Sequence, residues 1–186
     1  MGAIGCRHMS HSMPDAMSAV LGEVAETLRR VDAGQLDALA DAVLASRGVF
    51  LVGEGRSGLV ARCLAMRLMH LGLRAHVVGE TVTPAFGPGD LLVAVSGSGE
   101  TSFTRAAAAA AGDRGGTIAV VTAAADSPLA RLAAIRVLVP GGESAQFGGS
   151  LFEQAALLVL DSFALALQRR LGQSEQHMRA RHATLE

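Results

Sequence analysis

Five short, mostly apolar runs recur along the chain, and segments with helical periodicity separate them. Strands that are apolar throughout are typical of a parallel sheet whose two faces are both covered by helices. The alternation of such runs with helical segments therefore predicts an α/β domain built on a five-stranded parallel sheet. The predicted strands are residues 48–52, 75–78, 90–95, 117–121 and 135–139.

Helical patterns account for most of the remaining sequence. Between Met17 and Val31 the apolar residues fall on one stripe of an amphipathic helix, and Leu36 to Leu44 continue in a second helix. This order of elements indicates a flavodoxin-like three-layer α/β/α sandwich, in which ligands bind beyond the carboxyl ends of the strands. The later helices are predicted at residues 57–71, 101–111, 127–129, 150–170 and 174–182.

Composition argues against several classes of function. The 186 residues carry a formal net charge of −1, which provides no strong attraction to nucleic acid or to an anionic membrane. There is no Trp or Tyr, so few aromatic rings could stack on single-stranded bases. No apolar run reaches the roughly 18 residues of a membrane span. Two cysteines without a CxxC pair fit a reducing cytoplasm.

The N-terminal 16 residues are unlike the rest of the sequence, and they lack the apolar core of a signal peptide. We expect residues 1–16 to form a disordered extension in which His8 and His11 are solvated rather than bound to a metal. Residues 17–186 show no linker and no internal repeat. We therefore expect them to form one domain.

The segment Ser96 to Thr101, with the sequence SGSGET, follows the third predicted strand and precedes a helix. Gly97 and Gly99 allow the backbone to curve, so that its N–H groups converge with the helix N-terminus on an anion. The hydroxyl groups of the segment add donors, but no Lys follows, so the segment differs from a nucleotide P-loop. A single phosphate monoester fits these donors best, and a Ser/Gly turn with an N-cap is the structural alternative.

A second glycine-rich segment, GEGRSG at residues 53–58, follows the first predicted strand. Its G-x-G-x-x-G spacing is that of a dinucleotide-binding turn, and Glu80 stands where an acid would bind the ribose. A small dinucleotide-binding protein is therefore one alternative, and a plain strand-to-helix turn is another. Two such segments at neighbouring strand ends, however, fit one short phosphorylated ligand better.

Titratable residues near helix ends provide the candidate catalysts. Glu153 begins the long C-terminal helix among apolar residues, which would leave its carboxylate poorly solvated and usable as a base. A Glu in a first turn ordinarily stabilises the helix dipole alone. His182 lies near the C-terminus, where a solvated side chain is the ordinary expectation, and His70 is expected to be packed or capping rather than catalytic.

Taken together and in this order, six segments resemble those of the 6-phospho-3-hexuloisomerases, a family of sugar isomerase (SIS) domains. The resemblance extends from about residue 22 to the C-terminus. The segments that carry it are residues 53–58, 65–72, 78–84, 96–101, 149–153 and 181–186.

The resemblance implies interconversion of D-arabino-3-hexulose 6-phosphate and D-fructose 6-phosphate through a 2,3-enediol, in the ribulose monophosphate route of formaldehyde fixation. It implies a cytoplasmic homotetramer without cofactor or metal, whose partner is a small-molecule sugar phosphate. It assigns catalysis to Glu153, as base, and to His182, as acid/base. It assigns substrate or phosphate binding to Gly53, Arg56, Ser57, Ser96, Gly97, Ser98, Gly99, Glu100 and Thr101.

Two further alternatives stay open at this point. Another SIS isomerase, such as arabinose 5-phosphate isomerase, would share the domain but act on an aldose. A SIS module that binds sugar phosphate and regulates a partner would keep the Ser/Gly segment without needing a base. The presence of Glu153 at the expected position argues against such a module.

Overall fold

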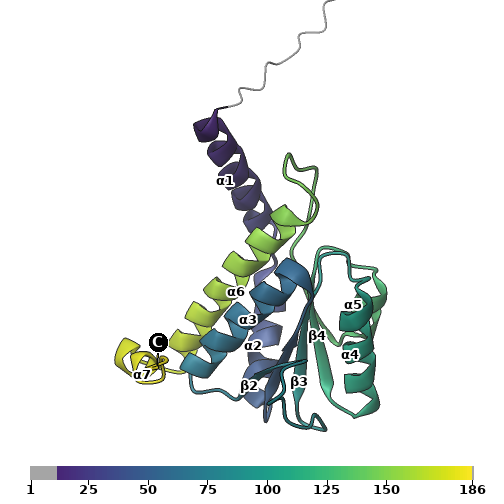
Figure 1. Ribbon diagram of the computed structural model, residues 1–186, viewed down its shortest axis with the longest axis vertical. Helices are drawn as coiled ribbons and strands as arrows, with labels where there is room; N and C mark the ends of the chain where they lie inside the picture. Colours follow the sequence, from purple (N-terminus) through teal and green to yellow (C-terminus); the bar gives the residue numbers. More distant parts are fainter. Residues whose placement is uncertain (1–11, 186) are drawn as a thin grey trace, which may run out of the picture.

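The computed structural model describes residues 12–185 and contains a five-stranded parallel sheet (Figure 1). The strands lie in the order β2-β1-β3-β4-β5, and every neighbouring pair is parallel. The predicted fold class is therefore confirmed. The strands are β1 Val49–Val52, β2 Ala75–Val77, β3 Leu91–Val95, β4 Thr117–Thr122 and β5 Ile135–Leu138.

Alternate residues of β1, β3 and β4 face two separate apolar clusters, with helices on either side of the sheet (Figure 1). On one face, Leu51 and Val93 join the buried sides of α2, α3 and α6. On the other face, Phe50 and Leu92 pack with α4 and α5. Both faces are covered, which explains why the strands are apolar throughout. The helices are α1 Met13–Arg29, α2 Ala33–Ala45, α3 Gly55–His70, α4 Ser102–Asp113, α5 Pro128–Leu132, α6 Ser150–Arg170 and α7 Glu175–Arg179.

Helix α1 begins at Met13, within the expected extension, so the expectation of disorder is wrong for residues 13–16. The side chain of Ser12 caps the helix by accepting a hydrogen bond from the Asp15 amide. Pro14 in the first turn has a fixed φ that suits a helix start. The remainder of the expected extension, residues 1–11 with His8 and His11, lies outside the described residues.

The start of α3 also differs from the prediction. The sequence predicts a helix start at Ser57, but the helix begins at Gly55, and Glu54 occupies the N-cap position. Gly55 adopts a φ of +56°, which only glycine adopts without strain, so the chain turns into the helix there. Ser57 is consequently a buried residue of the first helical turn.

The strand order places the two glycine-rich segments next to each other at the carboxyl edge of the sheet. The chain leaves β1 toward α3 on one face and leaves β3 toward α4 on the other face. Adjacent strands whose connections run to opposite faces form the topological switch point, where sheets of this kind bind ligands. Segments 53–58 and 96–101 therefore lie where a ligand site is expected.

Among the described helices, α6 is the one that is long and apolar enough to cross a membrane, by length and composition alone. Half of its apolar window is buried inside the protein. It packs against α1, α2 and α3. This burial favours the role of a core helix.

Candidate functional site

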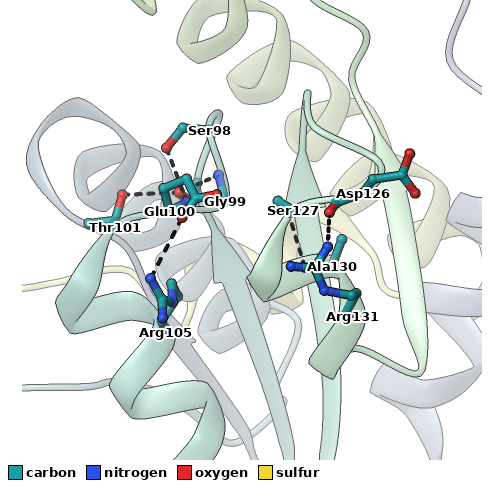
Figure 2. Close-up of polar contacts among 10 residues, drawn as sticks. Ser98, Gly99, Glu100, Thr101, Arg105, Asp126, Ser127, Ala130 and Arg131 are labelled. Atoms are coloured by element: carbon teal, nitrogen blue, oxygen red, sulfur yellow. Dashed lines mark hydrogen bonds and ion pairs between the residues drawn. The ribbon is translucent and has the colours of Figure 1, made fainter.

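The loop from Ser96 to Thr101 is held in shape by its own hydroxyl groups (Figure 2). Ser96 is buried, and its Oγ accepts a hydrogen bond from the Gly99 amide at 3.1 Å. The same Oγ lies 3.1 Å from the Thr101 Oγ1. The Ser98 Oγ accepts a hydrogen bond from the Glu100 amide at 3.2 Å. The buried Ser96 hydroxyl thus shapes the loop, whereas Ser98 is exposed and accessible to a ligand.

Among the backbone amides of this loop, those of Ser98 and Thr101 are available to an anion near α4. The N–H groups of Ser98 and Thr101 donate no hydrogen bond within the part of the chain that the structure describes. Both lie just before α4, where the positive end of the helix dipole also favours an anion. The Glu100 carboxylate lies 3.6 Å from the Arg105 guanidinium, so its charge is balanced on the same helix end (Figure 2).

Gly97 and Gly99 let this loop pack directly on its neighbours. A Cβ on Gly97 would lie 2.9 Å from the Phe152 ring, and a Cβ on Gly99 would lie 2.0 Å from the Ser127 Oγ. Gly99 also has a φ of +63°. The Gly97 carbonyl accepts a hydrogen bond from the Thr122 hydroxyl at 3.2 Å. The sequence analysis did not predict that Thr122 and Ser127 support this loop. The available signal was their position after the fourth predicted strand.

In the turn after β1, residues 53–58, backbone segments pack closely on one another. A Cβ on Gly53 would lie 2.9 Å from the carbonyl oxygens of both Ser57 and Val95, and a Cβ on Gly58 would lie 2.6 Å from the Gly53 oxygen. Both positions therefore require glycine for packing alone. The contact with Val95, the last residue of β3, places this turn beside the loop 96–101.

Glu153 lies in the first turn of α6 and forms an ion pair with Arg56, through the Arg56 Nε and the Glu153 Oε2. The Glu153 side chain is 17% exposed, and that of Arg56 is 58% exposed. The preceding residue, Phe152, is the one that packs on Gly97. The structure thus brings the two glycine-rich segments and the start of α6 together. The sequence did not predict the ion pair, because it depends on how α3 packs on α6.

Comparison with known proteins agrees with this arrangement. Residues 44–166 match the SIS domain family. A 3-hexulose-6-phosphate isomerase from Mycobacterium gastri is 43% identical over 178 residues, which cover 91% of this chain and 89% of the relative. One from Bacillus subtilis is 37% identical over 179 residues, which cover 91% of this chain and 97% of the relative.

A solved structure supports the same assignment. It is that of a hypothetical protein from Methanococcus jannaschii with an inferred function of 3-hexulose-6-phosphate isomerase. It matches with a TM-score of 0.85 at 30% identity, over 92% of this chain and 99% of that chain. The chain belongs to the SIS-domain family, in its 3-hexulose-6-phosphate isomerase branch. The resemblance predicted from the motifs is confirmed, since 6-phospho-3-hexuloisomerase is the same activity in other words.

The SIS domain does not bring His182 to Glu153 within one chain. The His182 ring stacks on the buried ring of His70, with centroids 5.2 Å apart and an interplanar angle of 16°. His70 ends α3, whereas Arg56 lies in its first turn, about 20 Å away at 1.5 Å per residue. Figure 1 shows α7 and the C-terminus at the far end of α6 from its first turn. The two predicted catalytic residues are therefore separated.

Burial is the main cause of a lowered pKa at His70, and electrostatic repulsion from His182 and Arg67 lowers that pKa further. The neutral ring is thus the form that packs, as expected of a packed histidine. Arg181 donates hydrogen bonds from its Nη1 to the His177 carbonyl at 3.1 Å and to the His70 carbonyl at 3.5 Å. The C-terminal segment is therefore ordered beside the end of α3.

The dinucleotide alternative finds little support in this SIS domain. In the dinucleotide-binding order the third strand lies beside the second, whereas here β3 lies beside β1. Glu80, the expected ribose ligand, is paired at 3.8 Å with Arg62 on the surface. Across residues 12–185, no group of three or more His, Cys, Asp or Glu side chains is placed to hold a metal ion.

Proposed function

We propose that this SIS domain interconverts D-arabino-3-hexulose 6-phosphate and D-fructose 6-phosphate. The observation that carries the proposal is the position of Glu153. Its helix begins beside the predicted phosphate loop, residues 96–101, where Phe152 contacts Gly97. The substrate class comes from the names of the relatives. A phosphate at residues 96–101 would leave the carbon chain of the sugar to extend toward the Glu153 carboxylate.

The phosphate would be bound mainly by backbone. The amides of Ser98 and Thr101, the exposed Ser98 hydroxyl and the N-terminus of α4 supply the donors. The other residues of the loop, Ser96, Gly97, Gly99 and Glu100, would maintain its shape. Gly53 and Ser57 would form the opposite wall, because their close packing fixes the turn next to the loop.

The reaction follows from the position of the carbonyl. The substrate ketone is at C3. Phosphate blocks O6, and closing O1 or O5 onto C3 would give a four-membered ring, so the substrate is open-chain. Glu153 would take the proton from C2, and the electrons would move toward O3 to give a 2,3-enediol. The same group would return a proton to C3 while the C2 hydroxyl loses its proton and becomes the ketone. O3 would gain a proton from the proposed acid/base, His182, and the proton lost from O2 would restore that residue. The sugar gains and loses no electrons overall, so the proposed reaction uses no cofactor.

Arg56 would orient the base. Its guanidinium contacts one carboxylate oxygen, Oε2, of Glu153. The other oxygen would then face the sugar carbons. Because the Arg56 side chain is more than half exposed, it could also contact the bound phosphate or a sugar hydroxyl.

His182 would act in the site of a neighbouring subunit, as acid/base for the oxygens or for ring opening of fructose 6-phosphate. Its position beside His70, at the far end of α3 from Arg56 and Glu153, supports this proposal. Exposed apolar side chains on three helices would support a homo-oligomer, which we propose to be a tetramer. They are Met13, Met17 and Leu21 on α1, Leu59, Met66 and Met69 on α3, and Leu158 and Leu165 on α6.

The experiment that tests the function is a coupled assay. Purified protein would receive 3-hexulose 6-phosphate, and fructose 6-phosphate would be measured as it forms. Arabinose 5-phosphate, supplied in parallel, tests the aldose alternative. Turnover of the hexulose alone supports the proposal. Turnover of neither substrate would contradict it and favour a module that only binds sugar phosphate. The proposed setting is the cytoplasm, in the ribulose monophosphate route.

A further inference from the structure

The segment that carries Glu153 into the site is a loop between β5 and α6, residues 140–149, which we name the base loop. Glycines stand near both of its ends, at Gly141, Gly142, Gly148 and Gly149. Gly148 has a φ of +59°, and no atom lies within 4 Å of the position of a Cβ there. The Phe147 side chain is 95% exposed. The loop is therefore not held by burial of its own side chains.

Glu23 of α1 makes three hydrogen bonds to the base loop. Its carboxylate accepts from the Ser144 hydroxyl at 2.7 Å, from the Ala145 amide at 2.8 Å and from the Gln146 side-chain amide at 2.9 Å. These bonds, the one from Gln146 first, lower the pKa of Glu23. A lowered carboxyl pKa means that the ionised form is the one bound, and charged acceptors make the stronger hydrogen bonds.

Arg30, the C-cap residue of the same helix, makes a second connection to the base loop. Its Nη2 lies 3.3 Å from the Pro140 carbonyl oxygen and 3.2 Å from that of Gly141. Within the described residues, the hydrogen bonds that join the base loop to elements other than α6 all run to Glu23 and Arg30. Glu23, Thr27 and Arg30 are spaced so that they share one face of α1, and Thr27 is buried. This face of α1 is therefore the one that packs on the rest of the protein.

The connection continues from the base loop to the carboxylate of Glu153. The Phe147 carbonyl accepts hydrogen bonds from both the amide and the hydroxyl of Ser150, at 3.3 and 2.8 Å. The Gly149 carbonyl accepts the Glu153 amide at 3.0 Å. The first turn of α6 is thus built on the loop that Glu23 holds. A shift of the loop would shift the start of the helix on which the base stands.

We propose that Glu23 is a positioning residue for catalysis, which sets the place of Glu153 by holding the base loop on α1. The inference rests on the proposed function for its effect on turnover, while its effect on the loop is independent of any activity. The phosphate loop is shaped by its own internal hydrogen bonds, in which Glu23 takes no part. Loss of the three hydrogen bonds should therefore lower kcat and leave KM nearly unchanged.

The experiment uses a fluorophore placed in the base loop. The chain has no Trp or Tyr, so Phe147→Trp introduces one strong fluorophore at an exposed position. In this background Glu23→Ala should lower the fluorescence anisotropy of the introduced tryptophan, because the loop gains freedom. It should also lower kcat by about 10- to 100-fold, the scale of a displacement near 1 Å at a reacting group.

Three further variants separate positioning from a general structural effect. Glu23→Gln keeps an acceptor for the Ala145 amide and should give intermediate anisotropy and kcat. Gln146→Ala leaves α1 intact and should shift both quantities in the same direction by less. Glu26→Gln is the matched control, because Glu26 is on the same helix but pairs with Arg29 in solvent. It should change neither.

The outcomes distinguish this inference from the proposed function. An active parent whose kcat is unchanged in Glu23→Ala despite a loosened loop would overturn the positioning role. An anisotropy that stays the same in Glu23→Ala and in Gln146→Ala would overturn the connection itself. A parent without isomerase activity would instead count against the proposed function, and the anisotropy would still report on the loop.

Discussion

The two loops that position the residues of the candidate site are held in different ways. The phosphate loop, residues 96–101, is fixed from within by the Ser96 hydroxyl and from behind by Thr122 and Ser127. The base loop, residues 140–149, is attached by side chains of a separate helix. A rigid backbone suits an anion site, because the donors are in place before the ligand arrives. A loop attached at its surface leaves the base able to adjust.

We expect this difference to separate substrate binding from the chemical step. Changes in the phosphate loop should act mainly on KM, and changes in the base loop or at Glu153 should act mainly on kcat. An interaction that is made only in the transition state affects kcat, whereas one that is also made in the ground state affects KM. Each prediction below tests one side of this division.

The largest effect is expected for Glu153→Gln. It removes the proposed base but keeps the size of the side chain, and general base steps commonly contribute about 10²- to 10⁴-fold. We expect kcat in the coupled assay to fall by that amount. Binding of inorganic phosphate, measured by calorimetry, should be preserved. Turnover close to that of the unmodified protein would remove Glu153 from the mechanism.

A smaller but distinct effect is expected for Gly99→Ala. The new Cβ would lie 2.0 Å from the Ser127 Oγ and would require a φ of +63°, so the phosphate loop must shift. KM should rise by about tenfold, equivalent to about 1.4 kcal/mol of binding, with a lower Tm. Unchanged KM in steady-state kinetics would show that this loop does not bind the phosphate.

Gly148→Ala provides the matched change in the base loop. It has a similar φ, +59°, but no atom within 4 Å of the new Cβ. The cost is then only that of the left-handed backbone, about 1–2 kcal/mol. We expect a modest fall in kcat and little change in KM. A rise in KM as large as that of Gly99→Ala would contradict the division between the loops.

The smallest effect concerns pH at the far end of α3. Because the pKa of His70 is lowered, the unfolded chain binds a proton more readily than the folded one below pH ~6.5, the ordinary pKa of histidine. Stability from the neutral His70 is therefore present above that pH and is lost as the pH falls. The protection factors of residues 174–185, which are the ratios of intrinsic to observed exchange rates and so remove the intrinsic effect of pH on amides, should fall on acidification, and less so in His182→Ala. Protection factors that do not change with pH would contradict the prediction.

The fold could be read from sequence because its signals are local. Apolar strands between amphipathic helices indicate a covered parallel sheet, and Gly53, Gly97 and Gly99 stand where the structure needs close backbone contact. Helix starts were less predictable. Ser57 has a good capping side chain, but the turn permitted at Gly55 starts the helix earlier.

The parts of the site that were not predicted depend on contacts distant in sequence. The pairing of Glu153 with Arg56 requires α3 to pack on α6, and the pairing of Glu23 with Ala145 joins residues 122 positions apart. No periodicity or motif encodes such pairs. The separation of His182 from Glu153 has the same origin, since α6 is long enough to carry the C-terminal segment to the other end of α3.

The most direct measurement is a crystal structure of the protein with a bound hexulose or hexose 6-phosphate. The account predicts that the phosphate oxygens lie within hydrogen-bond distance of the Ser98 and Thr101 amides. It predicts also that a Glu153 carboxylate oxygen lies about 3–3.5 Å from C2 or C3 of the sugar, as a reacting pair requires. A phosphate bound elsewhere, or a carboxylate far from both carbons in every subunit, would contradict the account.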